Sequence, residues 1–428
     1  MISRRTAAFI KLCGLLRRIE ENRDDLALVK KLNMALLKEI LRDEAHILQQ
    51  RATLQDLKRR LKKERPTREE ARQLRKKIDK AGARIAAYFD QIFVWKSIGD
   101  GLAYAYISSF NIKHVFFDTT SMDPKPDPGF ISGKAGLDNE KLFLLSAIRH
   151  GVPAVLCDIT NVLRFGDICL LGASDPYPIE VKSRKQLNQR GQRQADKLEK
   201  LHKFLAEDYA ADFRGSPEVR RSELAVPVRD HLDVLNDCIR SAKEDGYSLV
   251  CPEPGLTYWA IYQPGPLPPL DELAAEQPVV VILNLDKTDR NWAPYLPFVN
   301  SIRDPAAVLD FLTDKLTIVV AIELAVLCDK LTMPGWSVSF LEHHDLAILF
   351  EDPQSGARWA VSRQFFGRLA FEFLSVEWFA EHEKAMVTNV NSDAVAGMGS
   401  PVDGGVTADM TAYLDQIPKI ITRSQPAQ

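Results

Sequence analysis

The stretch Phe165-Gly-Asp-Ile-Cys-Leu-Leu171, together with Pro178-Ile-Glu-Val-Lys-Ser183, decides the fold that we expect for this chain. Both are short apolar runs of strand character, and each carries charged residues that a buried strand normally lacks. Side chains of a strand alternate between its two faces, so Glu180 and Lys182 share one face. If the two runs pair as a hairpin, Asp167 lies beside Glu180. Two carboxylates and one ammonium then meet at one spot, which suits a divalent metal that binds a phosphate and activates water.

Tripeptides of the form acid-x-Lys are rare in this chain. They occur three times, at residues 56–58, 123–125 and 180–182. The first lies in a long helical charge run, and the second lies in a proline-rich loop. Only the third lies in a β-type run with another acid, Asp167, on the strand before it.

With these residues the chain resembles the PD-(D/E)XK nuclease superfamily, which has the restriction-endonuclease-like fold. The resemblance implies an α/β (α+β) core of one helix, three antiparallel strands, a second helix and a further strand. It also implies that Asp167 is the first acid of the motif, Glu180 the second acid and Lys182 the lysine. Gly166 stands where the superfamily's name has a proline. The resemblance covers about residues 136–207.

The helices and strands expected around the motif follow the order that the resemblance implies. Asp138 is a capping residue for a helix that we expect to end near His150. Strands are expected over residues 152–160 and 164–171, and a second helix follows the motif. Glu140 lies in the first turn of the first helix, where the resemblance places a further metal-linked acid. Four residues compete for the glutamine that the superfamily often has at the start of the second helix: Gln186, Gln189, Gln192 and Gln194.

The resemblance implies a metal-dependent nuclease that hydrolyses phosphodiester bonds of nucleic acid, with DNA favoured. Mg²⁺ or Mn²⁺ would be held by Asp167 and Glu180, and Lys182 and Glu140 would complete the catalytic set. A restriction or anti-phage role follows by analogy alone. Two alternatives stay open: a non-catalytic nucleic-acid-binding or oligomeric scaffold protein on the same fold, and a helical interaction protein with a coincidental motif. Without a metal, Asp167 and Glu180 would pair with Lys182 and Arg184 as ion pairs on the strand surface, a kind of pair that contributes about 0–1 kcal/mol.

Positive charge is concentrated in two runs, although the net charge of the chain is only −2. Residues 51–80 hold 13 Lys/Arg against 5 Asp/Glu, and residues 182–203 hold 8 against 2. The first run fits a solvated helix face as well as contact with a polyanion. The second flanks the expected site, so it predicts a nucleic-acid-binding surface. Its phosphate-binding candidates are Arg184, Lys185, Gln186, Arg190 and Arg193.

The length of 428 residues indicates two or three domains. We expect a helical hairpin or coiled coil over residues 1–95 and a nuclease-like domain with insertions over 96–300. A C-terminal α+β region over 301–390, whose residues 303–330 are expected to be helical, precedes a flexible tail over 391–428. A short helix is expected near 408–414, inside this tail.

The N-terminal segment predicts two long helices. Apolar residues from Leu26 to Leu61 recur mostly at three- and four-residue steps, and Pro66 ends that pattern. The next residues, Thr67-Arg-Glu-Glu70, form a capping box for a second helix. The stripe spans about 36 residues, or about 54 Å, which outreaches a compact domain. We therefore expect a homodimer or larger homo-oligomer built partly through residues 20–95.

Composition argues against several other classes of protein. The chain has no apolar run of 18 residues and no signal-peptide pattern, so we expect a cytoplasmic protein without membrane contact. Its six cysteines show no paired spacing, which favours reduced core residues over a zinc site. His343 and His344 are adjacent, and on a strand they would point to opposite faces and not share a metal.

Overall fold

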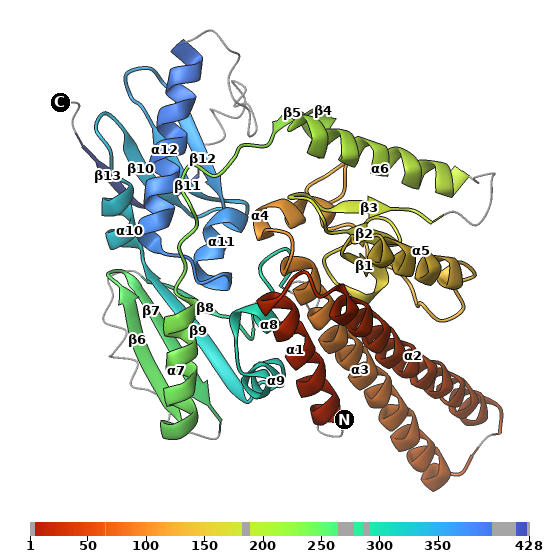
Figure 1. Cartoon of the computed structure of the whole chain (residues 1–428). Helices are drawn as coiled ribbons and strands as arrows, with labels where there is room; N and C mark the ends of the chain where they lie inside the picture. Colours follow the sequence, from red (N-terminus) through yellow and green to blue (C-terminus); the bar gives the residue numbers. More distant parts are fainter. Residues whose placement is uncertain are drawn as a thin grey trace. The chain divides into compact units, whose positions relative to one another are not determined.

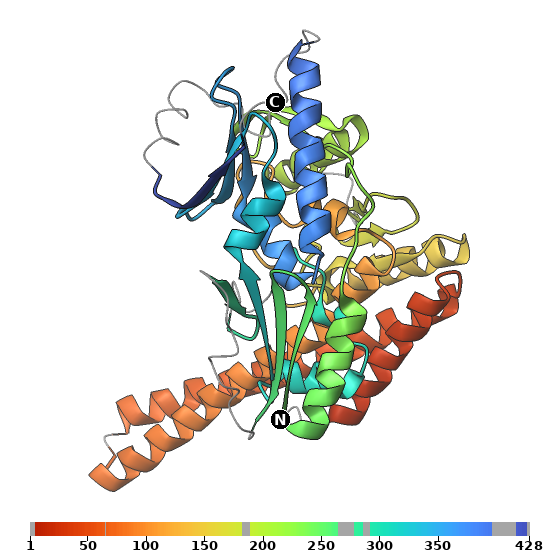
Figure 2. The ribbon, with the colours of Figure 1, turned by 90° about the vertical axis from the view of Figure 1, so that its left-hand side faces the viewer.

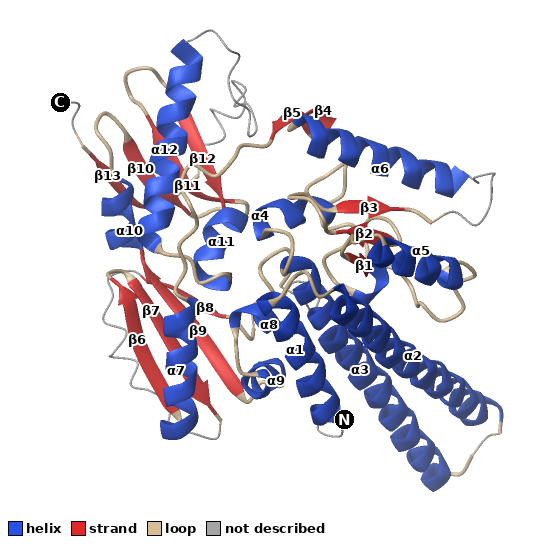
Figure 3. Cartoon of the chain, in the orientation of Figure 1, coloured by secondary structure: helices blue, strands red, loops and turns tan. Residues whose placement is uncertain are grey.

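The computed structural model describes residues 5–64, 66–181, 189–263, 278–285, 292–395 and 417–425. The fold is a mixture of helices and antiparallel sheets (Figure 3). The chain divides into two compact units. Unit 1 holds residues 1–118, 123–202 and 289–300, and unit 2 holds residues 119–122, 203–288 and 301–428. No boundary of this division lies near residue 95, because the N-terminal helices belong with the motif-bearing segment, whereas the chain does pass from one unit to the other after residue 300.

Three helices open unit 1: α1 (Thr6–Glu21), α2 (Leu26–Lys63) and α3 (Arg68–Tyr104) (Figure 1). The predicted hairpin of two long helices is confirmed, and so is the capping box between Thr67 and Glu70 that starts α3. Helix α3 runs on through residues 99–101. The glycines there allow close packing, because a Cβ at Gly99 would lie 2.0 Å from the Ile159 carbonyl oxygen.

The apolar stripe of α2 is covered by the chain itself. Leu32, Leu36 and Ile47 are fully buried within this single chain, and Leu48 is the one large hydrophobic residue of the described hairpin that is exposed. The prediction that a long leucine surface remains exposed is therefore wrong. The homo-oligomer that rested on that surface stays a prediction without this support.

A small sheet follows the helices in unit 1. Helix α5 (Leu137–Arg149) leads into β1 (Ala154–Leu156), β2 (Ile168–Leu170) and β3 (Tyr177–Ile179), and α6 (Gln189–Glu207) follows. The strands are antiparallel in the order β1-β2-β3, so the predicted pairing of the two charged runs is confirmed. This pairing contradicts the alternative of a purely helical protein.

The sheet differs from the expectation in two respects. Its strands are shorter than predicted, because the chain turns into the 3₁₀ helix η3 (Cys157–Ile159) after β1. The next strand after α6, β4 (Tyr209–Phe213), pairs with β5 (Ser216–Arg220) and not with this sheet. The further strand that the resemblance implies is therefore absent from the described part of this sheet.

Side chains of the two long helices brace the sheet. The Asn33 amide donates to the Ala154 carbonyl and accepts from the Leu156 N–H, both at 3.1 Å, so it completes the outer edge of β1. Buried Asp100 accepts hydrogen bonds from the backbone N–H groups of Asn161 and Val162 and from the Asn161 amide. The sheet is thus fixed to the helices by buried polar contacts as well as by apolar packing.

Unit 2 contains two larger antiparallel sheets. One has the order β6-β7-β9-β8, and the other has the order β12-β11-β10-β13. Their strands are β6 (Tyr247–Glu253), β7 (Leu256–Tyr262), β8 (Pro278–Ile282), β9 (Leu316–Glu323), β10 (Ser337–Leu341), β11 (Leu346–Glu351), β12 (Arg358–Ser362) and β13 (Lys419–Ser424). The helices of this unit are α7 (Leu232–Asp245), α9 (Pro305–Leu312), α10 (Leu324–Leu331), α11 (Arg363–Phe371) and α12 (Val376–Val395). The short elements α4 (Ser109–Ile112), η2 (Lys113–Val115) and α8 (Phe298–Ser301) lie in connections.

Two predictions for the C-terminal part need correction. Residues 316–323 form a strand and not a helix, because this β-branched run is buried between β7 and β8 as a central strand. The tail is not uniformly flexible, since β13 pairs with β10. The helix predicted near 408–414 lies outside the described residues. No helix in the described part of the chain has the length and apolar character to cross a membrane.

Candidate metal centre

Asp167 directly precedes β2 and is held there by its backbone and its side chain. Its N–H donates to the Ile179 carbonyl at 2.8 Å, and its Oδ2 accepts the Val181 N–H at 2.9 Å. Gly166 permits this geometry, because its φ is +72° and a Cβ there would lie 2.8 Å from two backbone atoms of Ile179. The residue before Asp167 must therefore be a glycine in this structure.

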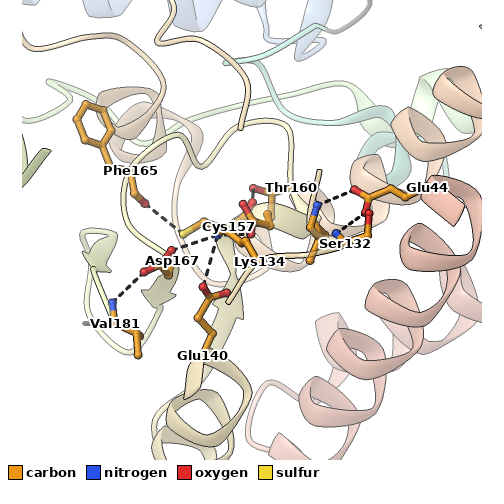
Figure 4. A network of polar contacts seen from close by, with 11 residues as sticks. Glu44, Ser132, Lys134, Glu140, Cys157, Thr160, Phe165, Asp167 and Val181 are labelled. Atoms are coloured by element: carbon orange, nitrogen blue, oxygen red, sulfur yellow. Dashed lines mark hydrogen bonds and ion pairs between the residues drawn. The ribbon is translucent and has the colours of Figure 1, made fainter. Parts of the chain in front are cut away.

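Two more carboxylates meet Asp167 around one ammonium group (Figure 4). Lys134 Nζ lies 2.6 Å from Asp158 Oδ2, 3.2 Å from Asp167 Oδ1 and 3.5 Å from Glu140 Oε1. Glu140 comes from the first turn of α5, and Asp158 comes from η3 directly after β1. Among the described residues, Lys134 is the one cation in ion-pair contact with these acids. We call Glu140, Asp158 and Asp167 the carboxylate cluster.

The carboxylate cluster is largely removed from water. The side chains of Glu140, Asp158 and Asp167 are 4%, 8% and 17% exposed, whereas that of Lys134 is 34% exposed. Burial, together with the nearby charge of Asp167, raises the pKa of Glu140 to about 7, although Lys134 opposes this rise. Burial also acts to lower the pKa of Lys134, but the three acids, Asp158 foremost, raise it above its usual value. The cluster thus holds a cation strongly.

The loop that carries Lys134 is anchored to the helical hairpin. Buried Glu44 of α2 accepts the N–H of Ile131 at 2.8 Å and the N–H of Ser132 at 2.7 Å. Arg164 pairs with Asp127 farther back in the same loop. The contacts tie the loop down at two points and fix Lys134 beside the cluster.

The register of β2 and β3 brings Glu180 to the same end of the strand pair as Asp167, because Ile168 pairs with Ile179. Glu180 directly follows β3 and is half-buried, and it acts on Lys125, where it opposes the lowering of the lysine pKa by burial. Lys125 also lies over the Phe165 ring, 3.9 Å from its centre. The partners that the structure gives Asp167 are Lys134 and Val181. The pairing of Asp167 with Glu180 as two ligands of one metal therefore stays a prediction.

Several predicted binding residues lie where the structure gives no description. Lys182, Arg184, Lys185 and Gln186 are outside the described residues, and for Arg190 only the backbone in α6 is described. Arg193 is exposed on α6. Helix α6 is fixed to the sheet through His202, whose ring stacks on Tyr177 with centres 4.3 Å apart. A further hydrogen-bond contact joins His202 Nε2 and the Pro178 carbonyl at 2.9 Å.

Oxygen ligands of this kind suit Mg²⁺ or Mn²⁺. The three carboxylates do not all approach one another within 4.8 Å, so three direct bonds to one ion would need a side-chain rotation. Mg²⁺ commonly takes only one or two carboxylates and keeps several waters. Asp158 and Asp167, which lie closest to the Lys134 ammonium, fit that smaller ligand set.

A second group of metal-ligand type lies in unit 2. His343, His344 and Asp345 bring their ligand atoms within 4.8 Å of one another in the turn between β10 and β11. The expectation that adjacent histidines point apart is wrong here, because they lie in a turn and not in a strand. His343 Nδ1 already accepts the N–H groups of Asp345 and Leu346 at 3.1 Å. We therefore interpret His343 as a structural residue of the turn.

Two members of the site were not predicted from the sequence. Asp158 and Lys134 lie 24 residues apart in the chain, and no local pattern links them. The position of Asp158 directly after an apolar strand was the one available signal. Comparisons with protein families, with curated proteins and with solved structures found no match for this chain.

Proposed function

We propose that this chain is a metal-dependent nuclease that hydrolyses phosphodiester bonds of nucleic acid, with DNA favoured. The carboxylate cluster carries the proposal. When Glu140, Asp158 and Asp167 are all ionised, they bear three negative charges against the single positive charge of Lys134. Unbalanced charge that is shielded from water is costly, and a divalent cation would offset it.

The chain's own residues have separate roles in this proposal. Asp158 and Asp167 would hold Mg²⁺ or Mn²⁺, which when bound polarises a phosphate and lowers the pKa of its water. Glu140, with a pKa of about 7, can exchange a proton with water near neutral pH. Lys125 and Glu180 lie together at the end of β3, where Lys125 would meet the charge of a phosphate. Lys182 would be the lysine of the motif and part of the catalytic set, as the sequence resemblance implies.

The order of elements supports the same proposal. A helix, three antiparallel strands and a helix follow one another from α5 to α6, as the resemblance to PD-(D/E)XK nucleases implies. Asp167 directly precedes the middle strand and Glu180 directly follows the third, and these are the two strands that carry the acids of that motif. We propose the restriction-endonuclease-like fold for this segment on these grounds.

One observation favours a second candidate function. The Lys134 ammonium lies in the place where a metal ion would be held, and it partly neutralises the cluster. A protein that binds nucleic acid without cutting it would need no metal ion at this site. The same assay separates the two functions.

The test is cleavage of plasmid, linear duplex, single-stranded DNA and RNA, each with Mg²⁺, Mn²⁺ or EDTA. We expect metal-dependent cleavage that falls by at least about a hundredfold in Asp167→Asn and Asp158→Asn. The matched control is Asp138→Asn on α5, whose side chain is 93% exposed and which should cleave as the wild type does. Glu180→Ala and Lys182→Ala decide whether these two residues belong to the site. Cleavage that persists in Asp167→Asn would overturn the assignment.

A further inference from the structure

The far end of the α2–α3 hairpin carries an ordered row of cations. Arg68, Arg72, Lys76, Lys80 and Arg84 follow one another at four-residue steps along α3, and all five are exposed. Residues four apart are neighbours on a helix, so this row is continuous and about 24 Å long. We call residues 54–84 the basic arm, of which the structure describes all but residue 65.

The centre of the cation row lies opposite the apolar face of the same helix. Leu74 and Ala81 are buried against the partner helix, and successive residues are turned by about 100° around the helix axis. That period places Arg72 and Lys76 nearly opposite this face, and the row winds gradually around the helix toward its ends. Figure 2 shows the ends of both helices extending away from the rest of unit 1. The row therefore faces solvent along its whole length.

Neighbouring side chains do not neutralise the row. Two acids of this part of α3 already have other partners. Glu70 belongs to the capping box, and Glu69 accepts a hydrogen bond from Gln73. The ion pairs found in the described arm lie on α2 and use Arg59 and Arg60. Like charges four residues apart destabilise a helix by about 0.2–0.5 kcal/mol per pair. The row contains a series of such pairs, and a bound polyanion would relieve their repulsion.

We propose that the basic arm binds the phosphate backbone of nucleic acid, at a surface separate from the carboxylate cluster. A straight row of cations fits a linear polyanion, which carries one charge per about 1.7 Å of duplex axis. A membrane surface fits poorly, because a helix that lies on lipid needs an exposed apolar face. Leu57 and Leu74 of the arm are buried instead, and none of its other leucines and isoleucines is exposed.

This inference shares the class of partner with the proposed function but does not require cleavage. Binding to phosphates fixes position without reading sequence, so binding through the arm should be insensitive to base sequence. It should also weaken steeply as salt increases, because bound cations release counterions from the nucleic acid.

The test compares two triple variants of the full-length protein in EDTA. Arg72→Glu, Lys76→Glu and Lys80→Glu together reverse the centre of the row. Lys30→Glu, Lys31→Glu and Lys38→Glu together make the same charge change on exposed residues near the base of α2. The probe is a labelled 30-base-pair duplex, with single-stranded RNA and phosphatidylserine vesicles as parallel arms. The arm variant acquires favourable pairs with Arg68 and with Arg84, so it should unfold no earlier than the wild type.

We expect the arm variant to bind the duplex at least about tenfold more weakly. The slope of its log–log salt dependence should fall by about 0.9 for each phosphate that the arm no longer neutralises. The control variant should bind nearly as the wild type does. Equal weakening in both variants, or a wild type that prefers vesicles, would overturn the inference. Binding in EDTA requires neither metal nor cleavage, so a failure of the nuclease proposal can be told apart from a failure of this one.

Discussion

At the scale of single residues, Lys134 determines the state of the carboxylate cluster. Its ammonium lies against Asp158 and Asp167 on the side where a metal ion would be held. A lysine and a divalent cation then compete for the same oxygens. The loop that presents this lysine is anchored through Glu44, so its release requires motion of the side chain or of the loop.

We predict that Lys134→Met strengthens metal binding. The change removes one positive charge at ion-pair distance from the ligands, and such a charge is worth about 4 kcal/mol at an effective dielectric constant of about 20. Partial exposure of Lys134 reduces this, so we expect a gain in Mn²⁺ affinity on the order of tenfold, measured by titration calorimetry. Lys141→Met on α5 is the matched control and should leave affinity unchanged. Weaker binding by Lys134→Met would show that the lysine supports the site instead.

The sequence singled out Asp167 as a charged residue beside a strand and Glu140 through the resemblance, and the structure brings both to Lys134. Their roles stay predictions. Lys134 was not predicted, because it lies 33 residues before Asp167 in a loop without periodicity.

At the scale of elements, local sequence signals predicted the helices better than they predicted the pairing of strands that lie far apart in the sequence. The capping box and the apolar stripe are encoded within a few turns of chain, so the α2–α3 hairpin was predicted. Residues 316–323 were assigned to a helix because a continuous apolar run fits a buried helix and a central strand equally well. Strand β13 is joined to β10 from about 80 residues away, which no local pattern reveals.

The junction between α3 and the turn after β1 gives a prediction at this scale. Asp100 accepts three hydrogen bonds there, two from backbone N–H groups and one from the Asn161 amide. Asp100→Ala leaves all three donors buried without an acceptor and should lower the free energy of unfolding by on the order of 3 kcal/mol. Asp100→Asn keeps one acceptor oxygen and should be less destabilised. Urea unfolding at about pH 7.5, above the pKa of about 6 to which burial raises Asp100, measures both.

The control for this junction is Asp79→Ala, because Asp79 is exposed on the same helix. It should stay within about 0.5 kcal/mol of the wild type. If Asp100→Ala is as stable as the wild type, the junction is not held by this carboxylate. Metal affinity should be unchanged in any folded Asp100 variant, since Asp100 binds the turn and not the cluster.

At the scale of the whole molecule, the chain covers apolar surface that was expected to need a second subunit. The reasoning from helix length assumed that a stripe of about 54 Å has no partner within one chain. Helix α3 runs antiparallel to α2 along this length, and α1 packs at the base, so the stripe becomes internal. What remains exposed on the far end of the hairpin is charge, which favours a different kind of partner.

The last prediction separates an internal stripe from an interface. Leu36 of α2 is fully buried within one chain, and Leu48 on the same helix is 47% exposed. Leu36→Ala should lower the free energy of unfolding by about 2–5 kcal/mol, through reduced burial and the cavity left behind. Leu48→Ala should change it by no more than about 0.5 kcal/mol. Light scattering should give the same mass for the wild type and both variants, with a melting temperature independent of protein concentration. A melting temperature that rises with concentration, together with a smaller species for Leu36→Ala, would restore the stripe as a subunit interface.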